Sequence, residues 1–153
     1  MKYKTIGAFK NVQNVGYCDA AEDMAVGMGV ILDQVNKVAS LPASADEAKA
    51  CYRIVTNIND KPEMHNFSET VVVLKGEKVR ADDLTTVANL EIEFAASEIA
   101  TDYNSVAVGS KLVFGEGGKL ETATDVDGYK VYFEVIKLTA YMGKGVLAVI
   151  RVQ

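Results

Sequence analysis

The sequence contains no tryptophan, one histidine and two cysteines among its 153 residues. Because His65 is alone, a metal site built from several histidines and a histidine relay are both excluded. Cys18 and Cys51 lie in no recognisable nucleophile motif, so a hydrolase that pairs either thiol with His65 is disfavoured. We expect both cysteines to be reduced and packed. A disulfide stays open, because spacing in the sequence cannot test its geometry.

Long hydrophobic runs and an excess of positive charge are also missing. No apolar run approaches the roughly 20 residues that a membrane helix needs, and the opening residues 1–6 contain no apolar run typical of a cleaved signal. Lys and Arg total 16 against 21 Asp and Glu, a net charge of −5 that argues against a nucleic-acid partner. The sequence therefore predicts a protein that is made in a cytoplasm, has no membrane partner, and stays soluble or assembles there.

The last third of the chain, Val106 to Val152, is built of short apolar runs rich in Val, Ile, Tyr and Phe. Glycine clusters separate these runs, which is typical of strands joined by tight turns. Similar runs recur from Met24 onwards. We therefore predict an all-β fold, a small β-barrel or sandwich of about nine short strands with one short helix and an irregular N-terminal arm.

Local signals refine this expectation. Ser44, followed three residues later by Glu47, is a capping box that predicts a helix over residues 45–50. The glycines of 115–118 predict a hairpin. The segment 129–141 is long for a single strand, so we expect a bend or bulge midway along it.

Several acidic residues are expected to lie in water. Asp82 and Asp83 precede two threonines and mark an exposed connector. Clean alternation over residues 90–94 places Glu91 and Glu93 on a solvated strand face.

The predicted domain organisation is an arm over residues 1–25 followed by one β domain over 26–153. Apolar residues recur every third position in the arm, with lysines, asparagines and glycines between them, a spacing that does not fit an α-helix. We expect these residues to be anchors that bind a partner, such as a neighbouring subunit; they are Tyr3, Ile6, Phe9, Val12 and Val15. The alternative is a segment that packs on its own barrel.

An internal echo predicts two similar β units, 26–58 and 106–138. The run from Val26 to Leu32 matches the run from Val106 to Leu112 in its apolar and glycine pattern. In both halves a glycine-led strand is followed by a hairpin, a loop and a returning apolar strand. Two units that pair with each other would remove free sheet edges.

Candidate chemistry is sparse. Asp82 with Asp83, and Asp125 with Asp127, could supply oxygen ligands to a hard cation, but plain turn chemistry is the preferred interpretation. Glu91 and Glu93 could mimic a glycosidase pair, yet both sit on one strand with no partner cleft in sight. We expect no catalytic residue, no metal and no cofactor.

The closing segments give the one family resemblance. The pattern Val106–Gly109–Leu112, then Gly117-Gly118-Lys119-Leu120, Phe133-Glu134-Val135 and 147–152, together with the arm and the lack of tryptophan, resembles the head decoration or cement proteins of tailed bacteriophages. The resemblance covers mainly residues 106–152 and carries over no site residue. It implies a non-enzymatic virion protein that binds the outer face of the capsid, with the major capsid protein as partner and self-association expected.

Two other classes stay open. One is another virion component of the tail, collar or fibre. The other is a carbohydrate- or receptor-binding β module, which would need a concave aromatic site and would involve Tyr129 or Tyr132. The absence of tryptophan and the dispersal of the seven tyrosines disfavour this second class.

Overall fold

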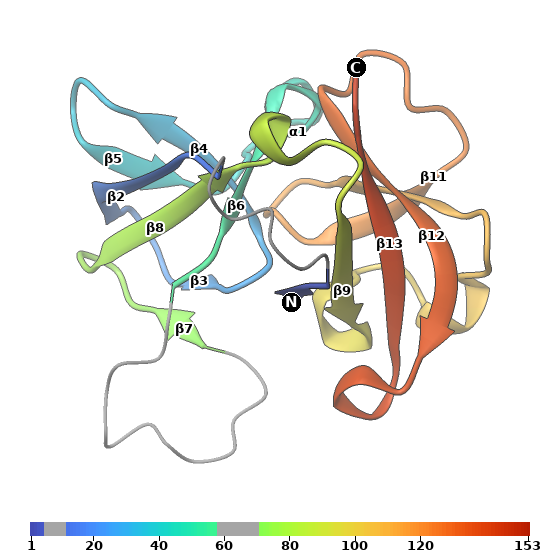
Figure 1. The fold of residues 1–153 in the computed structure, drawn as a ribbon. Helices are drawn as coiled ribbons and strands as arrows, with labels where there is room; N and C mark the ends of the chain where they lie inside the picture. The colour runs from blue at the N-terminus through green and yellow to red at the C-terminus, as the bar shows by residue number, and fades with distance from the viewer. Residues whose placement is uncertain (5–11, 58–70) are drawn as a thin grey trace.

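The computed structural model describes residues 1–4, 12–57 and 71–153, and within them the fold is all-β with one short α-helix (Figure 1). The expected fold class is therefore confirmed. The elements are β1 (Lys2–Tyr3), β2 (Asn14–Ala20), β3 (Met24–Ala25), β4 (Gly29–Asp33), β5 (Val38–Ser40), α1 (Ala45–Ala50), β6 (Arg53–Val55), β7 (Val72–Val73), β8 (Lys78–Asp83), β9 (Glu91–Ala95), β10 (Lys111–Phe114), β11 (Leu120–Ala123), β12 (Val131–Thr139) and β13 (Gly145–Val152).

The first half of the chain forms a closed barrel in the strand order β2-β5-β4-β6-β8. Its strand pairs are antiparallel except that β2 runs parallel to β5, which closes the ring. A small two-stranded sheet, β3 with β7, lies at one end (Figure 1). We call residues 14–83 the first barrel.

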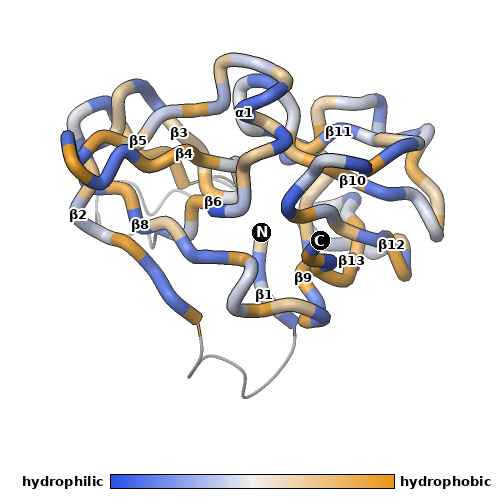
Figure 2. The backbone as a smooth tube through the Cα atoms, turned by 90° about the horizontal axis from the view of Figure 1, so that it is seen from above, coloured by the Kyte–Doolittle hydropathy of each residue, from blue (hydrophilic) through white to orange (hydrophobic). Residues whose placement is uncertain are grey.

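The second half, residues 91–152, repeats this strand arrangement, and we call it the second unit. Its sheet has the order β1-β9-β13-β12-β10-β11. If β1 is left out, each strand of this sheet corresponds to one strand of the barrel. For example, β10 pairs with β11 and β12, just as β4 pairs with β5 and β6. The two halves therefore share one topology. In Figure 2, hydrophilic and hydrophobic stretches occur in both halves.

Matching hydrogen bonds fix the correspondence residue by residue. Gly27 donates its N–H to the carbonyl of Val55 at 2.9 Å, and Gly109 donates to Val135 at 2.8 Å. Both glycines have a positive φ, +95° and +89°, a conformation that glycine adopts without a steric cost. Val26 thus corresponds to Val108, whereas the sequence echo aligned it with Val106.

The closing contact also recurs. In the first barrel Ala21 donates its N–H to the carbonyl of Ala39 at 2.8 Å; in the second unit Ala100 donates to Leu120 at 2.6 Å. A single parallel bridge between Ile99 and Leu120 stands where β2 pairs with β5 in the barrel. The second unit therefore curves in the same sense as the barrel. Its two ends are joined by one residue pair, whereas β2 and β5 of the barrel are joined by two.

Each half buries its own apolar cluster. The smaller cluster fills the first barrel and includes Met24, Val55 and Val79. The larger cluster fills the second unit, where Phe133 meets Phe94 and Phe114 edge to face at centroid distances of 4.9 and 5.4 Å. It also takes in residues from the outer side of the barrel, so the two halves share a continuous apolar contact.

The hairpin between β10 and β11 attaches the second unit to the barrel. Gly29 donates its N–H to the carbonyl of Gly118 at 2.7 Å, and Gly117 donates to the carbonyl of Pro42 at 2.9 Å. A Cβ on Gly118 would lie 2.5 Å from the Gly29 carbonyl oxygen, so only glycine permits this approach.

Several local predictions are confirmed. Helix α1 covers Ala45–Ala50, with the Ser44 side chain accepting from the Glu47 N–H. The 115–118 hairpin forms, and β12 bulges between Val135 and Lys137. Both cysteines are free and buried. The expected strand over Met24–Leu32 is instead broken by a turn between β3 and β4.

Two expectations about acidic residues were wrong. Asp82 and Asp83 belong to β8 and are only 3% and 7% exposed, so they are not an exposed connector. Glu93 is 4% exposed although it points to the outer face of its strand. In both places a segment distant in the sequence covers the carboxylate, which local alternation does not reveal.

Candidate binding sites

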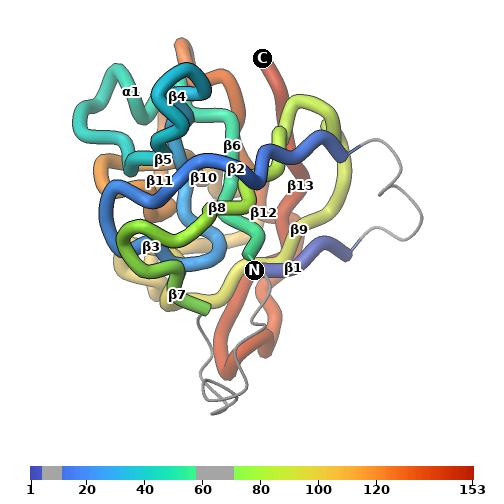
Figure 3. The backbone as a smooth tube through the Cα atoms, turned by 90° about the vertical axis from the view of Figure 1, so that its left-hand side faces the viewer, coloured from blue at the N-terminus to red at the C-terminus, as the bar shows by residue number. Residues whose placement is uncertain are grey.

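The N-terminal strand β1 adds to the edge of β9 through main-chain pairing. Lys2 lies opposite Glu93, Tyr3 opposite Ile92, and the N–H of Lys4 donates to the carbonyl of Glu91 at 2.8 Å. In Figure 3, β1 runs alongside β9. Among the residues that the structure describes, β2 of the first barrel has no such added strand, so β1 is an addition to the shared topology.

Lysines of this strand enclose the Glu93 carboxylate. Lys4 approaches Glu93 Oε2 at 3.0 Å and Lys2 at 3.8 Å. Burial opposes ionisation, but hydrogen bonds from Lys4 and Thr139 and the two lysine charges outweigh it and lower the pKa of Glu93. The charged Glu93 carboxylate therefore links the N-terminal segment to β9 through ion pairs with Lys2 and Lys4.

Tyr3 connects β1 to the first barrel. Its hydroxyl donates to Asp82 Oδ2 at 3.3 Å, and Arg80 Nε lies 3.8 Å from Asp82 Oδ1. Burial is the main cause that raises the pKa of Asp82. Burial and the nearby Asp82 charge likewise raise the pKa of Tyr3.

The five predicted anchor residues divide into two groups. Tyr3, Val12 and Val15 are partly buried and pack against the chain's own clusters. Val15 belongs to β2 and lies opposite Ala81. Ile6 and Phe9 lie outside the described residues. The described part of residues 1–25 thus follows the alternative expectation of packing on its own barrel, and a role in partner binding stays a prediction.

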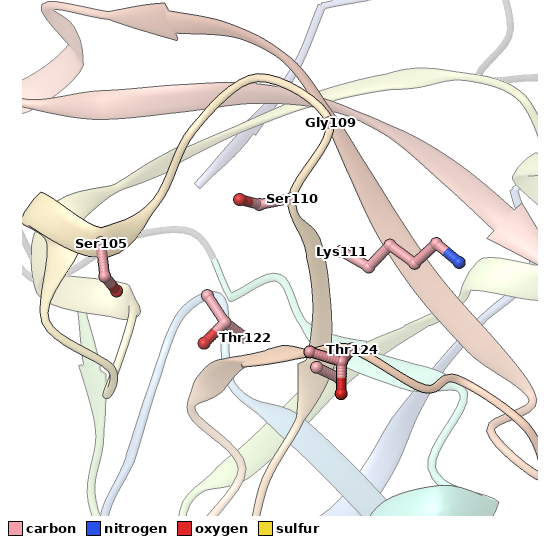
Figure 4. Close-up of a pocket in the computed structure, with 7 residues that line it drawn as sticks. Ser105, Gly109, Ser110, Lys111, Thr122 and Thr124 are labelled. Atoms are coloured by element: carbon pink, nitrogen blue, oxygen red, sulfur yellow. The ribbon is translucent and has the colours of Figure 1, made fainter.

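A groove of about 560 Å³ opens at one end of the second unit, between the start of β10 and the end of β11. We call it the Lys111 groove. In Figure 4, Ser105, Ser110 and Thr122 gather on one side of β10, while Lys111 extends on the other side beyond Thr124. The groove is lined by Ser105, Gly109, Ser110, Lys111, Thr122, Ala123 and Thr124.

Local geometry positions these side chains. Gly109 takes its left-handed conformation just before β10, and Ser110 Oγ accepts the N–H of Ala107 at 3.0 Å. Ser105 Oγ donates to the backbone carbonyl of Asp102 at 2.7 Å. The sequence signal for this groove was weak, because hydroxyl residues at strand ends are also typical of ordinary turns.

No protein-family model matches the chain, and no curated protein matches it.

The tyrosines considered for sugar binding do not line this groove. Tyr132 lies beside it with Lys111 Nζ 5.8 Å from its ring centroid, and Tyr129 has Lys49 Nζ at 6.0 Å. The concave aromatic site that a carbohydrate-binding module would need is not formed by the groove lining.

The catalytic and metal candidates come together nowhere in the described part of the chain. Cys51 is buried, and burial raises the pKa of its thiol to about 12. His65 lies outside the described residues. Asp127 donates its N–H to Asp125 in a turn, and the described residues contain no group of three or more metal-ligating side chains. Among them there is also no helix with the length and hydrophobicity to span a membrane.

Proposed function

We propose that this chain is a non-enzymatic structural protein of a tailed-phage virion that binds the outer surface of the capsid. The proposal rests on the resemblance of residues 106–152 to decoration proteins and on the way the N-terminus attaches. Its partner would be the major capsid protein, and copies would self-associate. The alternative within the same class is a tail, collar or fibre component.

One observation carries the proposal: β1 joins β9 by main-chain hydrogen bonds, and Lys4 forms an ion pair with Glu93. Strand addition of this kind needs only a free sheet edge and an extended segment. The apolar residues at positions 6 and 9 of the N-terminal segment would then bind a neighbouring subunit. Many such weak contacts, repeated over a shell, add through multivalency.

The sheet edges also fit a protein present at high local concentration. The first barrel is closed, and the outer edge of β11 is met by Ala100 and by Thr101, whose Oγ1 accepts the N–H of Thr122 at 3.0 Å. Covered edges disfavour unspecific strand pairing between copies.

The test uses arm variants in a binding assay with shells. The double substitution Ile6→Ser with Phe9→Ser should weaken binding to shells by roughly tenfold or more if both side chains are buried at the contact. Val35→Ser, at a side chain that is 90% exposed on the β4–β5 hairpin, is the matched control. Binding that is unchanged by the double substitution would contradict the role of the arm.

A further inference from the structure

We propose that residues 106–108 of the second unit are a docking edge for an extended apolar segment of a partner protein, which adds to them as an antiparallel strand. We call this segment, together with Ile136 and Leu138, the Val108 edge. The inference does not depend on the proposed capsid role. It rests on the first barrel, where the chain itself places a strand at the corresponding position.

The Val108 edge corresponds to residues 24–26 of the first barrel. The same turn follows both segments. The N–H of Met28 donates to the carbonyl of Ala25 at 3.2 Å, and the Met28 sulfur accepts the N–H of Ala25 at 3.3 Å. In the second unit the N–H of Ser110 donates to the carbonyl of Ala107 at 3.0 Å, and Ser110 Oγ accepts the N–H of Ala107 at 3.0 Å. The two segments therefore have the same local conformation and the same place in the shared topology.

In the first barrel a strand of the chain covers this position. β7 pairs antiparallel with β3, so that Val73 lies opposite Met24 (Figure 1). One residue beyond β3, the N–H of Val26 donates to the carbonyl of Val71 at 2.9 Å. Val73 is buried and belongs to the apolar cluster of the barrel. The occupant of this position is thus an extended run of valines.

The second unit has no segment of its own that can take the place of β7. β7 lies in the long connection between β6 and β8, residues 56–77, whereas residues 140–144 alone connect β12 to β13. This short connection turns at Tyr141–Gly143 and leaves no chain for an added strand. In the part of the chain that the structure describes, the sheets contain no strand that pairs with residues 106–108.

Val108 is consequently open in both its side chain and its main chain. It is 65% exposed, whereas its counterpart Val26 is partly buried. Among the described residues, the N–H of Val108 has no hydrogen-bond partner, whereas that of Val26 donates to Val71. The N–H of Val106 already donates to the carbonyl of Tyr103 at 3.0 Å. Val108 therefore supplies the main-chain donor that an incoming strand would use.

Two apolar side chains of β12 extend the exposed surface. Ile136 follows the residue that accepts the N–H of Gly109, so Ile136 and Val108 come from adjacent segments. Ile136 is 39% exposed and Leu138 is 45% exposed. Leu138 lies opposite Val146, which is fully buried, so it belongs to the core-facing side of β12 without being covered. An added apolar strand would give these side chains something to pack against.

The kind of partner follows from β7. Because Val26 and Val71 form a hydrogen-bonded pair, alternate residues of the added strand exchange main-chain bonds with the edge. We therefore expect an extended segment with β-branched apolar side chains and without proline at the positions whose N–H faces the edge.

The experiment is an amide-resolved NMR titration of the whole chain with a synthetic peptide that has the sequence of residues 70–75, Thr-Val-Val-Val-Leu-Lys. We expect saturable shifts at residues 106–109 and at Ile136 and Leu138. The control peptide carries Val71→Pro and lacks the N–H that would face Val108. It should give no saturable shifts.

Two protein variants make the test specific. Val108→Asp should weaken binding of the peptide by roughly tenfold, because a valine that becomes buried on binding is replaced by a charged residue. Val35→Asp is the matched control, since Val35 is a 90% exposed valine on the β4–β5 hairpin of the first barrel. The proposal would be overturned by shifts that do not saturate, by shifts confined to residues 24–26, where the peptide merely replaces β7, or by equal weakening in the two variants.

Discussion

The N–H of Gly29 and the carbonyl of Gly118 lie 2.7 Å apart, and this hydrogen bond joins the first barrel to the hairpin of the second unit. The bond exists because neither residue has a side chain: a Cβ on Gly29 would lie 2.6 Å from the Phe114 ring, and one on Gly118 would lie 2.5 Å from the Gly29 oxygen. The attachment of the two halves therefore depends on two glycines from different halves.

Two adjacent glycines allow this contact to be tested. Gly117→Ala should lower the free energy of unfolding by about 1–2 kcal/mol, the cost of a left-handed conformation, because φ is +75° and nothing lies near its Cβ. Gly118→Ala, at φ +77°, should cost more, because the methyl group also meets the barrel backbone. Denaturant unfolding measures both. Equal losses would show that the hairpin can move away without penalty.

Asp82 should make the protein less stable as pH rises. Burial raises its pKa, so the folded state binds a proton more tightly than the unfolded state, and stability falls as pH rises through the window between the two pKa values. Asp82→Asn keeps an acceptor for Tyr3 and removes the charge, so it should raise the melting temperature at pH 7 more than at pH 4. Destabilisation that is larger at pH 7 than at pH 4 would show that contacts of the charged carboxylate, such as the one with Arg80, outweigh burial.

Glu93 should have the opposite pH dependence. Its pKa is lowered, so its stabilising effect is present above the unfolded-state pKa and is lost as pH falls through the folded-state value. Glu93→Gln should lower the free energy of unfolding by about 1–3 kcal/mol at pH 7, since a buried charged hydrogen-bond acceptor is lost. At pH 3 the difference from wild type should shrink. A constant difference would indicate packing and not charge as its cause.

The two cysteines should be unreactive in the folded protein. Cys18 and Cys51 are 0% and 1% exposed, and burial raises the pKa of both thiols. Labelling with a thiol reagent at pH 8 should therefore follow unfolding, slow in buffer and complete in denaturant. Fast labelling of one thiol without denaturant would show that its part of the fold opens on its own.

Local sequence signals were sufficient for the elements that depend on near neighbours. The capping pair Ser44 and Glu47, the glycines of 115–118 and the long run of 129–141 each act within a few residues, and the helix, hairpin and bulge follow from them. The burial of Asp82 and Glu93 could not be predicted in this way, because the residues that cover them come from the N-terminal segment, far away in the sequence. These residues are Lys2, Tyr3 and Lys4.

The groove and the repeated topology were only partly visible in the sequence. The glycine-led strands gave an echo, but it aligned Gly29 with Gly109, whereas the hydrogen bonds to Val55 and Val135 show that Gly27 corresponds to Gly109. Two glycines lie close together at 27 and 29, so the pattern alone did not fix the alignment. The Lys111 groove combines strand ends and loops whose hydroxyl residues look locally like turns.

The central claim is that this chain binds the exterior of a capsid, and co-sedimentation tests it most directly. Purified protein is mixed with shells from its source, the shells are pelleted, and the pellet is imaged by cryo-electron microscopy. The account predicts saturable, stoichiometric binding with regular density on the outer surface. Protein that stays in the supernatant at every concentration, while the shells pellet intact, would contradict it.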